Sequence, residues 1–261
     1  MAKPMKINSL AYKNGEYCAG ESFQQFFNKR EGIFETMKSQ AGAILGLDYH
    51  LERFAKGALA SSLKSPPLEL LRGKVLELVS AYQNDALVRL VLCGEDWYLF
   101  GEVWVDVWDG KSAVSLLPVV AERANPEVKS LLAPVCMEAR SRAEAAGYEE
   151  ALLVDRFGNV SEGAWSNAFF VDEAGVLVTP AHGILPGVTR RLVLELAKGV
   201  CPVSEREFPL SEMLSDASEV FITQATRGIV PVERIDERVF NNERKITSLL
   251  QAALAGMKSA K

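Results

Sequence analysis

Apolar residues recur three or four positions apart in two stretches of the first half of the chain. In residues 47–63, this spacing places Leu47, Leu51 and Phe54 on one side of a helix. Residues 65–82 repeat the spacing after two prolines, which a first helical turn tolerates. The pattern predicts two consecutive amphipathic helices.

Other segments alternate between apolar and polar residues or are continuously apolar, as strands are. In the first half, the predicted strands are residues 86–93, 102–109 and 112–120. In the second half, strand patterns fill residues 148–180 and 218–235, and helices are predicted at 130–147 and 185–199. Helices and strands in both halves predict an α/β (α+β) fold and argue against a bundle or a sandwich.

A polar segment at residues 121–127, which contains an Asn-Pro pair, separates the two halves. We interpret it as a linker between a small N-terminal α/β domain, residues 1–120, and a larger C-terminal domain, residues 128–261. A chain of 261 residues is long enough for two modest domains.

Charge and cysteine content narrow the classes of partner. A net charge of −5 gives no basic footprint for nucleic acid or an anionic membrane, so small molecules are the expected partners. The four cysteines form no CxxC pair and the two histidines lie far apart, so no metal site is expected. Scattered cysteines, the lack of a long apolar run and the lack of a signal-peptide pattern favour a cytoplasmic protein.

Three charged residues lie beside apolar residues, where burial of the side chain would change its reactivity or its binding partners. Lys129 lies among apolar residues, and a desolvated lysine amine can attack a carbonyl carbon. Glu162 lies at the base of a predicted hairpin, where a buried carboxylate must be paired or accept hydrogen bonds. Arg53 lies on the first predicted helix and could anchor an anion. Taken alone, each is better explained as a solvated surface residue.

Two loops carry donors suited to a phosphate group. In residues 183–191, the sequence LPG precedes an apolar helix, so the N–H groups of Val188 and Thr189 can bind an anion. The alternative is that Thr189 only caps this helix. Residues 222–228 contain threonine hydroxyls that could add donors, or they form an ordinary polar turn.

These features occur in the same order as in the class IV aminotransferases, a family of pyridoxal-phosphate enzymes of fold type IV. The chain resembles that family in the segments EGIFETMK, LDYHLERF, VKSL, GYEEALLVDRFGNVSEGAWSNAFFV and ILPGVTRRLVLELA, which are collinear and cover most of its length. The resemblance implies a two-domain D-amino-acid aminotransferase-like fold that binds pyridoxal 5'-phosphate between the domains. It also implies a homodimer.

The resemblance assigns the cofactor's reactive end and its ring to three residues. Lys129 is expected to be the catalytic lysine that carries the cofactor as a Schiff base. Glu162 is expected to pair with the pyridine nitrogen. Asn167, at the end of the motif SEGAWSN, is expected to contact the cofactor as well.

The resemblance assigns the phosphate group of the cofactor to a second group of residues. By resemblance, Arg53 and the amides of Val188 and Thr189 bind the phosphate. The threonine that the family carries in the later loop aligns with Ala225. Thr226 is therefore the expected hydroxyl donor.

The resemblance leaves the reaction open. One alternative is an aminotransferase that moves an amino group between an amino acid and a 2-oxo acid. The other is 4-amino-4-deoxychorismate lyase, which releases pyruvate and 4-aminobenzoate, and a third is a catalytically idle homologue. Pro134, Trp165 and Gln224 depart from the family's pattern, so the donor, the acceptor and the stereochemistry stay open.

Overall fold

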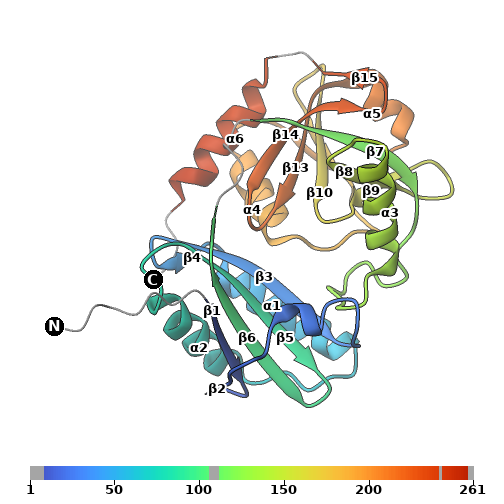
Figure 1. Cartoon of the computed structure of the whole chain (residues 1–261). Coiled ribbons are helices and arrows are strands. Elements are labelled where there is room, and N and C mark those ends of the chain that lie inside the picture. The colour runs from blue at the N-terminus through green and yellow to red at the C-terminus, as the bar shows by residue number, and fades with distance from the viewer. Residues whose placement is uncertain (1–8, 106–111, 241–242, 258–261) are drawn as a thin grey trace. The chain divides into compact units, whose positions relative to one another are not determined.

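The computed structural model describes residues 9–105, 112–240 and 243–257. The chain divides into two compact units, each with its own sheet and hydrophobic core (Figure 1). Unit 1 comprises residues 1–107, 128–132 and 258–261, and unit 2 comprises residues 108–127 and 133–257.

Unit 1 is built on an antiparallel sheet, with six strands among its described residues in the order β2-β1-β6-β5-β3-β4. These strands are β1 (Ser9–Lys13), β2 (Glu16–Tyr17), β3 (Ile33–Gln40), β4 (Ala43–Ile44), β5 (Ala86–Cys93) and β6 (Asp96–Val103). Helices α1 (Leu47–Ala60) and α2 (Leu68–Ser80) cover one face of the sheet. An aromatic cluster that includes the 3-10 helix η1 (Phe23–Gln25) packs on the other face.

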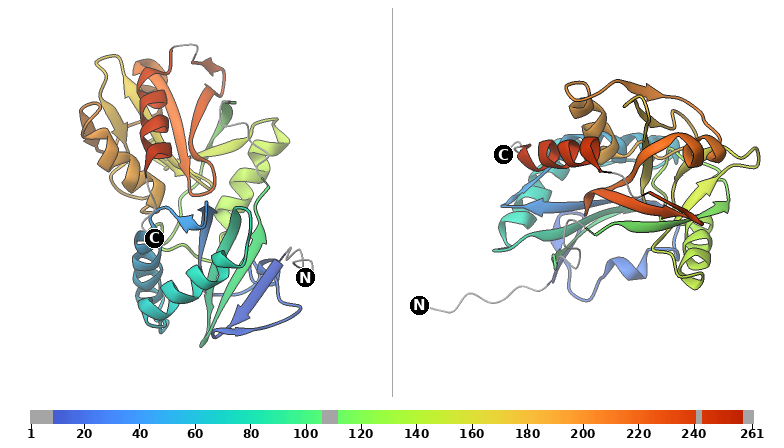
Figure 2. Two further views of the ribbon diagram at one scale, coloured as in Figure 1. Left: turned by 90° about the vertical axis from the view of Figure 1, so that its left-hand side faces the viewer. Right: turned by 90° about the horizontal axis from the view of Figure 1, so that it is seen from above.

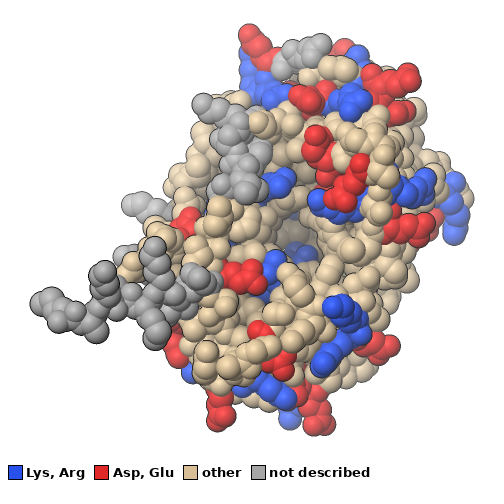
Figure 3. Space-filling model, viewed as in Figure 1, with Lys and Arg blue, Asp and Glu red and all other residues tan. Residues whose placement is uncertain are grey.

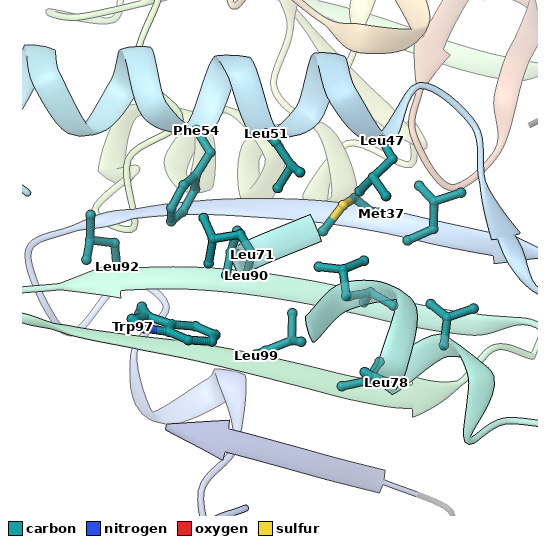
Figure 4. Packing of buried hydrophobic residues seen from close by; sticks show 14 of the residues in the cluster. Met37, Leu47, Leu51, Phe54, Leu71, Leu78, Leu90, Leu92, Trp97 and Leu99 are labelled. Carbon is teal, nitrogen blue, oxygen red and sulfur yellow. The ribbon is translucent and has the colours of Figure 1, made fainter. Parts of the chain in front are cut away.

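The core of unit 1 forms where α1 meets the sheet. Leu47, Leu51 and Phe54 project from α1 toward the strands of the sheet, and Leu47 lies beside Met37 of β3 (Figure 4); all four side chains are buried. Burying a side chain of this size contributes about 1.5–3 kcal/mol. The helical spacing in the sequence therefore identified the face of α1 that holds it on the sheet.

Unit 2 is built on a larger mixed sheet. Its described strands are β7 (Val114–Val120), β8 (Glu150–Val154), β9 (Val160–Gly163), β10 (Asn167–Asp172), β11 (Leu177–Thr179), β12 (Val203–Glu205), β13 (Ala217–Gln224), β14 (Gly228–Ile235) and β15 (Arg238–Val239). Its described helices are α3 (Pro134–Ala145), α4 (Val188–Ala197), α5 (Leu210–Asp216) and α6 (Lys245–Gly256). Because β9 pairs with β10 as well as with β8, the strands β10-β13-β14-β7-β8-β9 close into a ring.

The two faces of β10 and β13 carry different neighbours. Ala168 and Phe170 on β10 belong with Ile222 on β13 to the main cluster of unit 2. The alternate residues Phe169 and Phe221 stack on each other, with ring centroids 4.8 Å apart. Helices α4 and α6 pack against each other and against β13, while α3 packs on β7 and β8 (Figure 2).

The predicted α/β class and most predicted elements are confirmed. The helices predicted at 47–63, 65–82, 130–147 and 185–199 correspond to α1, α2, α3 and α4. The strand predicted at 102–109 is displaced: β6 spans Asp96–Val103 and follows β5 after a tight turn at Gly94, whose φ is 63°, so residues 104–105 of the predicted range lie outside the strand. Residues 106–109 lie outside the described residues.

The division of the chain differs from the predicted domain boundaries. The strand β7 and the predicted linker 121–127 belong to unit 2, because β7 pairs in parallel with both β14 and β8. Residues 128–132 belong to unit 1. Their backbone is hydrogen-bonded to β3 and to the residue before it. The N–H of Phe34 donates to the carbonyl of Lys129, and the N–H of Leu131 donates to the carbonyl of Gly32.

Charged side chains are interspersed on the face of the molecule that Figure 3 presents. Lysine and arginine alternate there with aspartate and glutamate. That face therefore carries no extended field of a single sign.

Candidate active site

Lys129 is held on the edge of the sheet of unit 1. Its carbonyl accepts a hydrogen bond from the N–H of Phe34 at 3.0 Å, and Ser130 bridges to Ile33. Its Nζ lies 4.6 Å from the centre of the Phe34 ring, and the side chain is half-buried. Pairing with β3 therefore fixes the backbone of Lys129, and an aromatic ring lies beside its Nζ.

Arg53 belongs to a buried network at the junction of α1 and β3. Its Nε and Nη2 donate to the two carboxylate oxygens of Glu35 at 2.7 and 2.6 Å, and Nδ1 of His50 donates to the same carboxylate at 2.7 Å. Burial by itself raises the pKa of Glu35, but the Arg53 charge and the hydrogen bonds from His50 and Arg53 outweigh burial and bring that pKa to about 2. Glu35 therefore fixes the guanidinium of Arg53 from one side.

His50 completes this network as a neutral ring. Burial lowers its pKa from the usual value, and the charges of Arg53 and the nearby Lys129 lower it further, against the opposite effect of Glu35. The sequence analysis missed both Glu35 and His50. The available signals were a carboxylate in an otherwise apolar strand and a histidine one helical turn before Arg53.

Glu162 is a buried carboxylate in unit 2 with partners on both oxygens. Its Oε1 accepts a hydrogen bond from Nη1 of Arg123 at 2.7 Å. Its Oε2 accepts hydrogen bonds from the N–H of Leu185 at 2.9 Å and from Nδ2 of Asn167 at 3.4 Å. The residue is 3 % exposed, and a neighbouring guanidinium favours the ionised form of a buried carboxylate. Arg123 was missed, because its segment reads as a linker.

Asn167 joins the Glu162 hairpin to the turn that begins α4. Its Nδ2 also donates to the carbonyl of Leu185 at 2.9 Å. A Cβ added at Gly187 would lie only 1.9 Å from its Oδ1, so that position requires glycine for close approach. The hairpin and the turn therefore form one hydrogen-bonded block.

The N-terminus of α4 presents backbone donors. Gly187 is the N-cap residue, and no side chain caps the helix. Val188 and Thr189 are the first two helical residues, so their N–H groups have no partner within the helix. The alternative that Thr189 is the capping residue is therefore wrong. The helix itself is anchored by Arg190, which donates to the carbonyl of Pro180 and to Glu205, both at 2.8 Å.

Two threonines lie near the end of β13. Thr226 lies in the turn that leads to β14 and is half-buried. Thr223 lies within the strand and is 3 % exposed, and its hydroxyl has no hydrogen-bond partner among the described residues. A buried hydroxyl without a partner indicates a polar group that the protein alone does not provide.

Trp165 supports the hairpin from the side of α3. It packs, partly buried, against the cluster that includes Cys136, Ala139 and Leu153. The turn around it is bound by Glu150, which accepts hydrogen bonds from the backbone there.

Glu150 also accepts a hydrogen bond from Nε2 of Gln224 at 3.4 Å. Burial raises its pKa to about 7, although Arg140 and the N–H groups of Ala151, Trp165 and Ala164 offset part of that effect.

The predicted residues thus fall into two groups, one in each unit. Unit 1 contains Lys129 and Arg53, with Glu35 and His50. Unit 2 contains Glu162, Asn167, Val188, Thr189 and Thr226, with Arg123 and Thr223. No cluster of three His, Cys, Asp or Glu residues suited to a metal ion occurs in the described ranges. Within those ranges, no helix has the length and apolarity needed to cross a membrane.

The two groups fit pyridoxal phosphate by the chemistry of their donors and acceptors. Lys129 provides an amine for the aldehyde, and Glu162 provides an anionic acceptor for a protonated ring nitrogen. The amides at the start of α4 and the partnerless hydroxyl of Thr223 provide donors for a dianionic group.

Comparison with known proteins identifies the family. Residues 32–235 match the model of the amino-transferase class IV family. A Thermotoga maritima protein named a probable branched-chain-amino-acid aminotransferase is 41 % identical over 234 residues, which cover 85 % of this chain and 84 % of that protein.

Solved structures share the fold. The branched-chain aminotransferase from Thermoproteus uzoniensis with norvaline superposes with a TM-score of 0.85 at 24 % identity, over 94 % of this chain and 93 % of that chain. The PLP-bound form of a hypothetical aminotransferase from Mycobacterium tuberculosis has a TM-score of 0.81 at 18 % identity, over 95 % of this chain and 98 % of that chain.

The 41 % identical relative is named a transferase, which favours the aminotransferase over the lyase alternative. The chain belongs to the class IV aminotransferase family, and it is an enzyme that uses pyridoxal 5'-phosphate to move amino groups between amino acids and 2-oxo acids.

Proposed function

We propose that this enzyme takes a branched-chain aliphatic amino acid as amino donor, with Lys129 as the catalytic lysine. The observation that carries the proposal is the amine of Lys129 beside the Phe34 ring, 4.6 Å from its centre. Phe23 and Phe27 extend this aromatic surface, at centroid distances of 5.4 and 5.5 Å from Phe34. Phe23 and Phe34 are already buried in the core, so Phe27, which is half-buried, is the ring whose remaining surface an aliphatic side chain could cover with a gain of free energy. The 41 % identical relative is named for branched-chain substrates.

In this proposal, each residue has a defined task. Bound pyridoxal phosphate supplies an electron sink for negative charge at the substrate's α-carbon. The amine of Lys129 would remove the proton from that carbon and deliver it to the cofactor carbon that keeps the amino group. Glu162, kept ionised by Arg123, holds a proton on the ring nitrogen. Asn167 keeps Glu162 aligned with the α4 turn.

The proposal assigns several donors to the phosphate. The N–H groups of Val188 and Thr189 face it at the positive end of the α4 dipole. Arg53 adds a guanidinium whose orientation is fixed by Glu35. The family resemblance assigns one hydroxyl donor to Thr226. These assignments are consistent with the helix start and the buried network described above.

The substrate assignment is tested by a half-reaction with single amino acids. Holo-protein incubated with L-leucine, L-isoleucine or L-valine should lose the absorbance of its bound cofactor aldehyde and release the matching 2-oxo acid. D-Leucine and L-aspartate serve as controls for stereochemistry and for side-chain chemistry. Lys129→Ala should convert none of them.

Other outcomes would identify a different enzyme. Conversion of D-amino acids only, or of L-aspartate in preference to L-leucine, would contradict the branched-chain assignment. Pyruvate released from aminodeoxychorismate would point to the lyase. Full turnover by Lys129→Ala would show that another group carries the chemistry.

The proposal includes a cytoplasmic homodimer. The four cysteines Cys18, Cys93, Cys136 and Cys201 are free thiols, as a reducing compartment would keep them. The dimer is inferred from the resemblance to the family. Light scattering of the holo-protein would test it, since a monomer would contradict it.

A further inference from the structure

The hydroxyl of Thr223 is an unexplained polar group in the core of unit 2. The residue is 3 % exposed on β13, and its Oγ1 has no hydrogen-bond partner in the described part of the chain. Burying a hydroxyl without a partner costs about 1–3 kcal/mol. Valine has the same shape, is also favoured in strands and would carry no such cost. Thr223 is therefore a candidate donor to a ligand.

The pairing of the strands places Thr223 beside the Glu162 hairpin. Asn167 lies opposite Glu162 on β9 and opposite Thr223 on β13. Residues directly opposite each other project from the same face of a sheet, with Cβ atoms about 4.5–5.5 Å apart. Glu162, Asn167 and Thr223 thus form a row of polar side chains across three neighbouring strands.

This row faces the helices of unit 2. Glu219 has the same orientation as Thr223, four positions away on β13, and its carboxylate accepts hydrogen bonds from the N–H groups of Ile246 and Thr247 in α6. Helix α4 packs against both α6 and β13. The hydroxyl of Thr223 therefore projects to the side on which α4 begins.

Asn167 links the row directly to the start of α4. Its amide donates to the carbonyl of Leu185, and its Oδ1 is the nearest atom to a Cβ built at Gly187, the N-cap residue. Thr223 is one strand away from Asn167. The register therefore brings its hydroxyl to the side of the sheet on which the first turn of α4 begins, where the N–H groups without a partner inside the helix can stabilise an anion.

We propose that the hydroxyl of Thr223 donates a hydrogen bond to the phosphate group of pyridoxal phosphate bound at the N-terminus of α4. The inference rests on the proposed function, because it places the phosphate at that helix start. It changes the assignment of the hydroxyl donor: Thr223 takes this role and Thr226, half-buried in the turn beyond, does not. Ala225 between them has no hydroxyl to offer.

The test compares two ligands that differ only in the phosphate. Cofactor-depleted protein is titrated with pyridoxal phosphate and with pyridoxal, and the dissociation constant is read from protein fluorescence and cofactor absorbance. The variants are Thr223→Val, which keeps the shape, Thr223→Ser, which keeps the hydroxyl, and Thr226→Val as the competing assignment. The midpoint of thermal unfolding without ligand checks that each variant is folded.

Thr223→Val should bind pyridoxal phosphate about 10- to 100-fold more weakly, because it loses one hydrogen bond to a charged group. Its affinity for pyridoxal should not change. Thr223→Ser should recover most of the loss, and Thr226→Val should lose less affinity for pyridoxal phosphate than Thr223→Val does.

Three results would overturn the inference. Unchanged affinity of Thr223→Val for pyridoxal phosphate would remove Thr223 from the site but leave the proposed function intact. An equal loss for both ligands would place the hydroxyl against the ring or in the fold. Wild-type protein that binds pyridoxal as tightly as pyridoxal phosphate would contradict the phosphate site itself.

Discussion

At the scale of single residues, the central feature is the pair formed by Glu162 and Arg123. A carboxylate that is 3 % exposed would ordinarily be protonated or unstable. Here a guanidinium at 2.7 Å and the N–H of Leu185 at 2.9 Å donate to its two oxygens, and a guanidinium favours a charged acceptor. Its charge, and not only its hydrogen-bonding capacity, is what a protonated ring nitrogen requires.

Glu162→Gln tests the charge while keeping the shape. The variant should retain pyridoxal phosphate but lose kcat by about 10²- to 10³-fold, because a neutral amide does not keep the ring nitrogen protonated. The measurement is the rate at which the α-proton of L-leucine exchanges with solvent, and absorbance quantifies the bound cofactor. Glu138→Gln, which removes an exposed carboxylate from α3, is the control. Wild-type exchange rates in Glu162→Gln would refute the role.

At the scale of elements, the block formed by β9, β10 and the turn before α4 positions the donors. The carbonyl and N–H of Leu185 both bind side chains of the hairpin. Gly187 allows this approach because a Cβ there would overlap the Oδ1 of Asn167. The start of α4 is thereby fixed relative to Glu162 more tightly than packing alone would fix it.

Gly187→Ala should therefore separate the turn from the hairpin. We expect a loss of about 1–3 kcal/mol in the free energy of unfolding, typical of overpacking, and weaker binding of pyridoxal phosphate. The matched control is Gly199→Ala at the other end of α4, where the nearest atom to a new Cβ, the carbonyl oxygen of Leu196, is 3.8 Å away. Urea unfolding and cofactor titration measure both effects. Equal behaviour of the two variants would contradict the close-approach argument.

At the scale of the whole molecule, the two units contain buried carboxyl groups with opposite pH dependences. The pKa of Glu35 in unit 1 is lowered to about 2, so its contribution to stability is present above pH 4.5 and is lost as pH falls toward 2. The pKa of Glu150 in unit 2 is raised to about 7. Its favourable contribution is therefore present below pH 4.5 and is lost as pH rises through 7.

Glu150→Gln should reveal the second dependence. The stability of the wild type relative to this variant should fall by about 3 kcal/mol between pH 4.5 and 8, because only the wild type must bury a charge at the higher pH. Urea unfolding followed by circular dichroism at both pH values measures this difference. Glu138→Gln, on the exposed side of α3, should show no such change. A constant difference for Glu150→Gln would mean that Glu150 does not titrate in this range.

Local patterns in the sequence were enough for the elements and for much of the candidate site. The helical spacing of Leu47, Leu51 and Phe54 predicted the buried face of α1 correctly, because a helix exposes only one stripe to the core. The motif around Glu162 and the LPG turn before α4 also singled out residues that the fold brings into one block. Residues without a local signature were missed, among them Arg123 in a segment that reads as a linker.

The sequence by itself determined the family and the start of α4, and it predicts Lys129 as the catalytic lysine, because each depends on a short contiguous motif. Only the tertiary structure decided that residues 128–132 belong to unit 1 and β7 to unit 2, since strand pairing joins segments far apart in the chain. It also decided the partners of Glu162 and Arg53 and the burial of Thr223. Those properties depend on which side chains meet across strands and helices, and no local pattern encodes such long-range contacts.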